Sequence, residues 1–291
     1  MNTFKTNKLS IGTAQFGFNY GITNLSGKVP LLQIKKILNF SRRNQILNID
    51  TAIDYKKSET ELGKCRLEKF KITTKIPPIP KKQKNIYKWI KNKIEYSLKK
   101  LNLNKIYAVL LHKPSQLNTN NGEDIYKALL QLKKEKYFTK FGVSVYSVGE
   151  LNNILKKYKI NIVNIPLSIA NKSFLKKNYL KKLKNNNIEI HVRSIFLQGL
   201  LVNYKLSKVN FLLKENFFQK YDKWLKKNRI SPVYACINFV KEIKEIDKII
   251  VGIDNFNQLK DIHYAFNTKK KINYPNFNFK KKISNPQFWK N

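Results

Sequence analysis

Apolar, β-branched runs alternate with amphipathic segments along almost the whole chain, and this alternation limits the folds that the chain can adopt. Eight runs have the length and composition of β-strands, at residues 8–12, 45–50, 70–75, 106–112, 139–144, 160–165, 188–193 and 247–252. Between them, apolar residues recur three and four positions apart, as in amphipathic helices, at Leu31–Arg43, Asn85–Lys100, Asp124–Lys134, Ser147–Lys157, Pro232–Lys241 and Phe256–Phe266. Strands that alternate with helices predict a parallel sheet built from βα units.

The number and spacing of these units predict a closed barrel. Eight units in 291 residues give roughly 36 residues each, the size expected of an α/β fold of the (β/α)8 TIM barrel type. A hydrophobic content of 42% is enough for one large core, so we expect a single domain. We place the barrel at 1–267, with an inserted helix within 201–230. The tail at 268–291 is expected to pack on the barrel rather than cover its mouth.

Single polar residues follow three neighbouring strands of this predicted barrel. Asp50 ends the second run, Lys75 ends the third and His112 ends the fourth, while Tyr55 lies five residues beyond Asp50. Active sites of such barrels lie at the carboxyl ends of the strands, where the side chains of neighbouring strands converge. We therefore predict that these four residues form one catalytic site.

These four groups suit the reduction of a carbonyl compound. A tyrosine hydroxyl has a pKa of about 10, and we expect the Lys75 ammonium to favour its phenolate, with Asp50 keeping the lysine charged and oriented. Tyr55 would then act as a general acid, and His112 would donate a hydrogen bond to the carbonyl oxygen. Because protein side chains supply no hydride, this chemistry implies a nicotinamide or similar cofactor.

The formal net charge of +40 does not by itself indicate a nucleic-acid partner. Clustered Lys and Arg residues bind phosphates, but the lysines here are spread over the whole chain beside abundant Asn and Ile, as an A/T-rich genome would produce. We expect no specific nucleic-acid partner, and an anion or nucleic-acid binder remains an alternative. The charge can still steer anionic cofactors and substrates towards the protein.

Membrane and export signals are not evident. No apolar run approaches the roughly 18 residues that span a bilayer, and Met1–Lys5 lacks the apolar core of a signal peptide. Cys65 and Cys236 belong to no paired motif, as expected of reduced thiols. We expect a cytoplasmic protein with no membrane partner and no metal site, as a monomer or homodimer.

Several motifs resemble those of the aldo-keto reductase family. The most specific is Asp50-Thr51-Ala52-x-x-Tyr55-x-x-Ser58-Glu59-x-x-Leu62-Gly63, and the stretch from Leu9 to Gly17 resembles the family's first strand and loop. Further similar segments are Thr73-Thr74-Lys75, Leu110-Leu111-His112, Gly142-Val143-Ser144, Arg193-Ser194-x-Phe196-Leu197-Gln198-Gly199-Leu200-Leu201 and Val251-Gly252. The resemblance covers about residues 8–267 and implies the same four catalytic residues, with NADP or NAD as the cofactor.

The resemblance also implies where the cofactor binds. Ser144 and Asn164 correspond to the residues that hold the nicotinamide amide, and Arg193 would flank the nicotinamide or the pyrophosphate. The remaining candidates are Asp50 again, Gly12 and Thr13 after the first strand, Ser194, Leu197 and Gly199 along the pyrophosphate, and Gly252, Asn255 and Gln258 at the adenosine end. A helix N-terminus near the last group suits a phosphate.

Some positions depart from the family pattern. Val145 and Lys56 replace an Asn and a Gly, while Asn255 and Gln258 lie where many relatives carry the Lys and Arg that bind the adenosine 2′-phosphate. Since charge-assisted hydrogen bonds are the stronger kind, NADPH, NADH or both remain open.

The substrate is expected to be a small carbonyl compound, with a sugar-derived carbonyl as the first class to consider. Gln15, Phe16 and Tyr20, on the loop after the first strand, are candidate substrate contacts together with Tyr55 and His112. A nucleotide-binding regulatory barrel without turnover is the alternative function.

Overall fold

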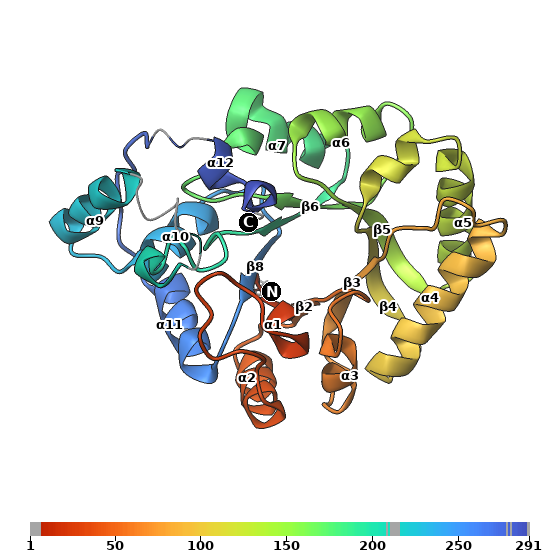
Figure 1. The fold of residues 1–291 in the computed structure, drawn as a ribbon, viewed down its shortest axis with the longest axis horizontal. Coiled ribbons are helices and arrows are strands. Elements are labelled where there is room, and N and C mark those ends of the chain that lie inside the picture. The colour runs from red at the N-terminus through yellow and green to blue at the C-terminus, as the bar shows by residue number, and fades with distance from the viewer. Residues whose placement is uncertain (1–6, 208, 210–215, 278, 280, 290–291) are drawn as a thin grey trace, which may run out of the picture.

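The protein folds as a closed barrel of parallel strands surrounded by helices. A computed structural model describes residues 7–207, 209, 216–277, 279 and 281–289. In that part of the chain eight strands close in the order β1-β2-β3-β4-β5-β6-β7-β8, with β1 paired to β8. Figure 1 shows the helices arranged as a ring around these strands. The predicted (β/α)8 TIM barrel is therefore confirmed.

The strands lie close to the predicted runs. They are β1 (Leu9–Gly12), β2 (Asn48–Asp50), β3 (Lys71–Ile76), β4 (Ile106–Leu111), β5 (Phe138–Ser144), β6 (Ile162–Pro166), β7 (Glu189–Arg193) and β8 (Lys248–Gly252). β2 begins three residues later than predicted and β6 two residues later, while every other strand end lies within one residue of its predicted position. Residues 45–47 are instead a turn and loop entered through Gln45, whose φ of 57° is left-handed.

The principal helices match the predicted amphipathic segments. They are α2 (Leu31–Arg43), α4 (Ile86–Leu101), α5 (Gly122–Lys134), α6 (Val148–Leu155), α10 (Pro232–Lys241) and α11 (Phe256–Asn267), with α9 (Phe217–Asn228) as the predicted insertion. Side-chain caps begin several of them. The side chains of Asn85, Ser147 and Asn255 each accept a hydrogen bond from a backbone N–H three residues further along.

The remaining elements are short. They are α1 (Ala14–Gly17), α3 (Ser58–Gly63), α7 (Tyr179–Asn185), α12 (Lys281–Ser284) and the 3-10 helices η1 (Pro114–Asn118), η2 (Ser173–Asn178), η3 (Tyr204–Leu206) and η4 (Pro286–Phe288). None of the helices in the described residues is both long and apolar enough to cross a bilayer.

Of the three hydrophobic clusters in the described residues, the two larger ones hold most of the buried apolar side chains. The larger one fills the layer between the barrel and the helices and contains buried Ile, Leu and Val residues from every strand. The second joins the segment after β7, helix α9 and the tail, with Phe217, Tyr221 and Trp289 among its members. Figure 1 shows α9 at the edge of the helical ring, outside α10. The Phe217 ring contacts the rings of Phe277 and Phe279, so this cluster attaches the tail to α9.

Candidate active site

A buried ion pair lies at the carboxyl ends of β2 and β3. The Lys75 ammonium is 2.5 Å from Asp50 Oδ1 and also donates to the Thr51 carbonyl at 2.8 Å. Lys75 is 1% exposed and Asp50 4% exposed. Successive side chains of a strand point to opposite faces. The Thr74 hydroxyl donates to Glu59 of α3, outside the barrel, so the Lys75 side chain points into the barrel. Removing one partner of such a pair would leave an uncompensated buried charge.

Tyr55 and His112 lie beside this pair, as predicted. Lys75 Nζ is 5.1 Å from the centroid of the Tyr55 ring, and the Tyr55 and His112 rings meet edge to face with 6.0 Å between centroids. Tyr55 belongs to the turn after β2, where the Ser58 amide donates to the Tyr55 carbonyl at 2.9 Å. The Ser58 hydroxyl also donates to the Thr13 carbonyl at 2.9 Å, which ties this turn to the end of β1.

The expected net lowering of the Tyr55 pKa is wrong, although a neighbouring ammonium such as Lys75 by itself favours the phenolate. The pKa of Tyr55 is raised above its ordinary value, because burial disfavours the phenolate and the negative charge of Asp50 adds to this effect. The charge of Lys75 is largely compensated by Asp50, whose carboxylate it contacts directly. Tyr55 therefore holds its proton at neutral pH, the state that a general acid requires.

His112 is held neutral. Burial, followed by the positive charges of Lys75 and Arg193, lowers the pKa of His112 to about 4. A neutral imidazole carries one N–H donor and one acceptor nitrogen. The ring can therefore donate one hydrogen bond to a carbonyl oxygen without carrying a charge.

Asn164 and Ser144 lie together at the mouth of the barrel. Ser144 ends β5 and is the register partner of Asn164, in the middle of β6, and both are buried. The Asn164 amide nitrogen donates to Asp50 Oδ2 at 3.3 Å, whereas its buried Oδ1 has no hydrogen-bond partner in the described residues. An unsatisfied buried acceptor indicates a missing partner, and an amide such as that of nicotinamide fits it.

The segment after β7 has an unusual backbone. Ser194, Leu197 and Gln198 have φ values of 60°, 52° and 55°, and Gly199 has a φ of 89°. Left-handed conformations are uncommon for residues other than glycine and concentrate at functional sites. A Cβ on Gly199 would overlap the Thr23 hydroxyl, so glycine is required there. The Leu197 side chain is buried in the second cluster.

The remaining cofactor candidates lie at the ends of β1 and β8 and at the start of α11. Gly12 and Gly252 are register partners, and Thr13 is buried with its hydroxyl donating to the Asp50 carbonyl at 3.1 Å. Thr13 thus fixes β2. Asn255 caps α11, since its side chain accepts from the Gln258 amide at 3.0 Å.

Asp254 beside them was missed from the sequence. Gln258 Nε2 donates to Asp254 Oδ2 at 3.2 Å, and Gln258 Oε1 accepts from the Asp254 amide at 2.8 Å. Asp254 Oδ1 is buried without a hydrogen-bond partner in the described residues, and burial raises the pKa of this carboxyl. The sequence does show an acidic residue directly before Asn255, the N-cap of α11, and this position could have marked Asp254 as a candidate at the adenosine end.

The three predicted substrate contacts lie in different surroundings. Tyr20 is 37% exposed, and its ring meets edge to face the ring of Phe18, which lies beside that of Tyr55. Gln15 lies against Gly252, and its side chain partly opposes the rise in the pKa of Asp254 that burial causes. Phe16 is fully buried in the main core at 0% exposure, so its predicted role in the pocket does not fit its position.

Phe18 is the aromatic residue of this loop that the sequence reasoning missed. Its ring lies 5.5 Å from that of Tyr20 and 6.2 Å from that of Tyr55. Aromatic residues occur at both Phe16 and Phe18, and only the course of the loop decides which of them faces Tyr55.

Arg193 lies at the end of β7, on the reactive side of the barrel, with its guanidinium over the ring of Tyr146.

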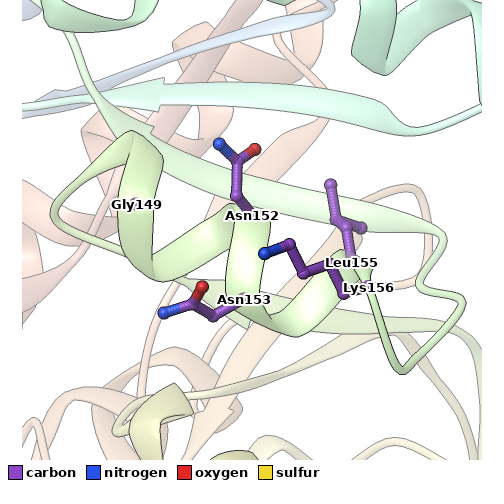
Figure 2. A pocket seen from close by; sticks show the side chains of 5 residues that line it. All are labelled: Gly149, Asn152, Asn153, Leu155 and Lys156. Carbon is purple, nitrogen blue, oxygen red and sulfur yellow. The ribbon is translucent and has the colours of Figure 1, made fainter.

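A separate hollow, shown in Figure 2, is lined by α6 and the residue after it, with Asn152, Asn153 and Lys156 around it. It contains none of the predicted catalytic or cofactor residues. The buried His191 forms a hydrogen bond of 2.6 Å between its Nε2 and Glu189 Oε1 in the barrel.

Comparisons with known proteins show the family and the fold of the chain. The sequence matches the model of the aldo/keto reductase family over residues 8–274. No curated protein matches the chain. Among solved structures, an aldo-keto reductase from Bacillus halodurans in its holo form is 16% identical with a TM-score of 0.72, covering 92% of this chain and 89% of that one. A glycerol dehydrogenase from Gluconobacter oxydans is 17% identical with a TM-score of 0.69, covering 91% and 88%.

Proposed function

Because the chain belongs to the aldo/keto reductase family and is an oxidoreductase of that type, we propose that it reduces an aldehyde or ketone to an alcohol with NADPH or NADH. The observation that carries this proposal is the buried Lys75–Asp50 pair directly beside the Tyr55 ring, with His112 against the same ring. Tyr55 can supply a proton and His112 can donate a hydrogen bond at the same point, and the reduction of a carbonyl group requires both.

Each residue has a distinct part in the proposed reaction. His112, neutral, donates a hydrogen bond to the carbonyl oxygen and positions it. A bound dihydronicotinamide would supply hydride to the carbonyl carbon. As negative charge develops on the oxygen, Tyr55 donates its proton there, and Lys75 beside the ring stabilises the phenolate that remains. Asp50 holds the Lys75 ammonium in place through their direct contact.

The cofactor would lie across the ends of β5 to β8. Ser144 and the free Oδ1 of Asn164 would hold the nicotinamide amide, and the left-handed segment from Ser194 to Gly199 would follow the pyrophosphate. Gly12 and Gly252, which have no side chains, would leave room for the dinucleotide at the β1–β8 edge.

The adenosine end favours NADH in this proposal. Asn255 and Gln258 supply no positive charge, and Asp254 places a carboxyl group among them. A carboxylate near an adenosine ribose accepts a hydrogen bond from the 2′-hydroxyl and repels a 2′-phosphate. We therefore propose that NADH binds at least as tightly as NADPH.

The experiment that tests the function combines binding with turnover. Cofactor affinity is measured by fluorescence titration with NADH and NADPH, and cofactor oxidation is then followed with a panel of aldehydes, ketones and sugar-derived carbonyl compounds. We expect turnover by the wild type, and a loss of roughly 100- to 10,000-fold in kcat for Tyr55→Phe at similar cofactor affinity. Tyr264→Phe is the matched control, because Tyr264 is 74% exposed on α11.

The alternative is a nucleotide-binding regulatory barrel. Tight cofactor binding without oxidation by any carbonyl compound of the panel would support it and contradict the catalytic proposal. Equal activity of Tyr55→Phe and wild type would remove Tyr55 from its role as the acid.

A further inference from the structure

The side chain of Arg193 extends across the mouth of the barrel. Arg193 ends β7, and its Nη2 donates to the Val145 carbonyl at 3.0 Å. Its guanidinium carbon lies 4.3 Å from the centroid of the Tyr146 ring. Val145 and Tyr146 directly follow β5, and β6 separates β5 from β7. The guanidinium therefore passes over the end of β6 and is fixed there by a carbonyl group and an aromatic face.

This charge has no acidic partner in the part of the chain that the structure describes. The other buried cation of the site, Lys75, is paired with Asp50, whereas no ion pair joins Arg193 to a carboxylate. Its Nη1 makes only a long contact of 3.4 Å with the Ser194 hydroxyl. Several N–H groups of the planar guanidinium remain available, in the geometry that binds carboxylate and phosphate groups through two parallel hydrogen bonds.

The guanidinium is also close to the reactive groups. Its positive charge is among the causes that lower the pKa of His112, and it partly opposes the rise in the pKa of Tyr55 and of Tyr20. An anion bound to Arg193 would therefore lie near the carbonyl group that Tyr55 and His112 would hold. Such an anion could belong to the substrate or to the diphosphate of the cofactor.

We propose that Arg193 binds a carboxylate or phosphate group of the substrate, so that the protein prefers carbonyl compounds carrying an anionic group. This inference rests on the proposed carbonyl reduction. It adds a substrate class to that function, because a neutral aldehyde offers the free guanidinium no partner. The net charge of +40 acts in the same direction by steering anions towards the protein.

The test uses 4-carboxybenzaldehyde and benzaldehyde, which differ by one carboxylate. The ratio of their kcat/KM values is measured for wild type, Arg193→Gln, Arg193→Lys and Arg42→Gln. Arg42 is the matched control, since it also contacts a ring, Phe70 at 5.6 Å, and a backbone carbonyl, but lies at the C-terminal end of α2. A charge-assisted hydrogen bond should give wild type and Arg42→Gln a preference of roughly 10- to 100-fold for the carboxylated aldehyde.

Arg193→Gln should reduce this ratio to near one, and Arg193→Lys should retain part of it. A wild type that reduces benzaldehyde equally well would overturn the inference while leaving the proposed function intact. Absence of activity with both aldehydes and with the wider panel would instead reject the proposed function.

Two binding measurements separate the sources of the anion. Fluorescence titration gives the Kd of NADH for wild type and Arg193→Gln, and calorimetry follows the binding of benzoate to the cofactor-loaded protein without turnover. We expect similar NADH affinities and benzoate binding that requires Arg193. If Arg193→Gln weakens NADH binding, lowers both aldehyde rates equally and leaves benzoate binding unchanged, the guanidinium serves the cofactor and the inference is wrong.

Discussion

Lys75 and Asp50 depend on each other, because both are buried at the same point of the barrel. Loss of the ammonium would leave the carboxylate of Asp50 with the Asn164 amide as its remaining side-chain donor. Loss of the carboxylate would leave a lysine that is 1% exposed without its counter-ion. The pair therefore links the stability of the barrel to the chemistry at its mouth.

Lys75→Met should destabilise the protein by about 3–5 kcal/mol, the usual cost of breaking a buried ion pair by removing one partner. The free energy of unfolding is measured with urea. Lys127→Met is the control, because Lys127 and Glu123 form an exposed pair at 3.7 Å that is worth about 0–1 kcal/mol. Equal effects of the two substitutions would contradict the assigned burial of Lys75.

The two titratable rings of the site should not change charge near neutral pH. Tyr55 has a raised pKa, and that of His112 is lowered to about 4. We expect kcat/KM for reduction to vary little between about pH 6 and 9. A pH profile of the wild type checks this. A limb with a midpoint near pH 7 that disappears in His112→Gln would show that His112 titrates normally.

The lowered pKa of His112 also predicts how the stability of the folded protein depends on pH. His112 in the unfolded chain takes up a proton near pH 6.5, whereas the folded protein does so only near pH 4. The unfolded state therefore binds more protons between these values, and the folded state loses stability as pH falls through this window. His112→Gln should reduce this loss.

At the scale of elements, the turn that carries Tyr55 fits closely against helix α1. A Cβ on Gly17 would overlap the Tyr55 carbonyl oxygen and crowd the Ser58 amide. The turn is fixed further by the hydrogen bonds from Ser58 to the end of β1. The position of the phenol is thus determined by contacts between α1, β1 and the turn after β2.

Gly17→Ala should displace this turn, lowering both Tm and kcat. Gly149→Ala is the control, because an added Cβ in α6 would have only the Ser147 hydroxyl near it, at 4.0 Å. Alanine is favoured over glycine in a helix by about 0.5–1 kcal/mol, so this control should be as stable as wild type or slightly more so. Thermal unfolding and steady-state kinetics distinguish the two. Wild-type kinetics for Gly17→Ala would refute the close fit.

The sequence predicted the strands, the main helices and the position of the four reactive groups because each follows from local patterns. Apolar runs specify the strands, and barrel geometry places their ends together. Contacts across loops were not predictable in this way. Three features depend on the paths of loops. They are the hydrogen bond from Arg193 to Val145, those between Gln258 and Asp254, and the position of Phe18, instead of Phe16, beside Tyr55. No periodic pattern encodes those paths.

The direction of the Tyr55 pKa was missed for a related reason. The sequence shows that a lysine and a tyrosine can meet, but not that Asp50 contacts the ammonium directly while the phenol is buried. Burial and the relative distances of the charges determine the sign.

At the scale of the whole molecule, the second hydrophobic cluster connects the tail to the barrel. Phe217 is buried at its centre, and its ring contacts those of Phe218, Tyr221, Phe277 and Phe279. The Tyr274 hydroxyl also donates to the Ala235 carbonyl of α10 at 2.8 Å. We propose that this cluster holds the 268–291 tail on the barrel.

Phe217→Ala should destabilise the protein by about 3–5 kcal/mol, the usual cost of removing a buried aromatic ring, and should release the tail to proteolysis. Tyr264→Ala, at a position 74% exposed, is the control. Urea unfolding gives the free energy of unfolding, and the rate of trypsin cleavage near Lys269–Lys271 shows whether the tail has been released. Wild-type resistance to trypsin in Phe217→Ala would show that the tail is held elsewhere.

The central claim is that hydride passes to a carbonyl carbon while Tyr55 supplies the proton. The most direct test is the reduction of a carbonyl compound with NADH deuterated at C4 of the nicotinamide, with mass spectrometry of the alcohol. Wild-type protein should place one deuterium on the carbinol carbon, and Tyr55→Phe should form almost no alcohol while still binding NADH. Alcohol without deuterium, or deuterated alcohol formed equally fast by Tyr55→Phe, would contradict the account.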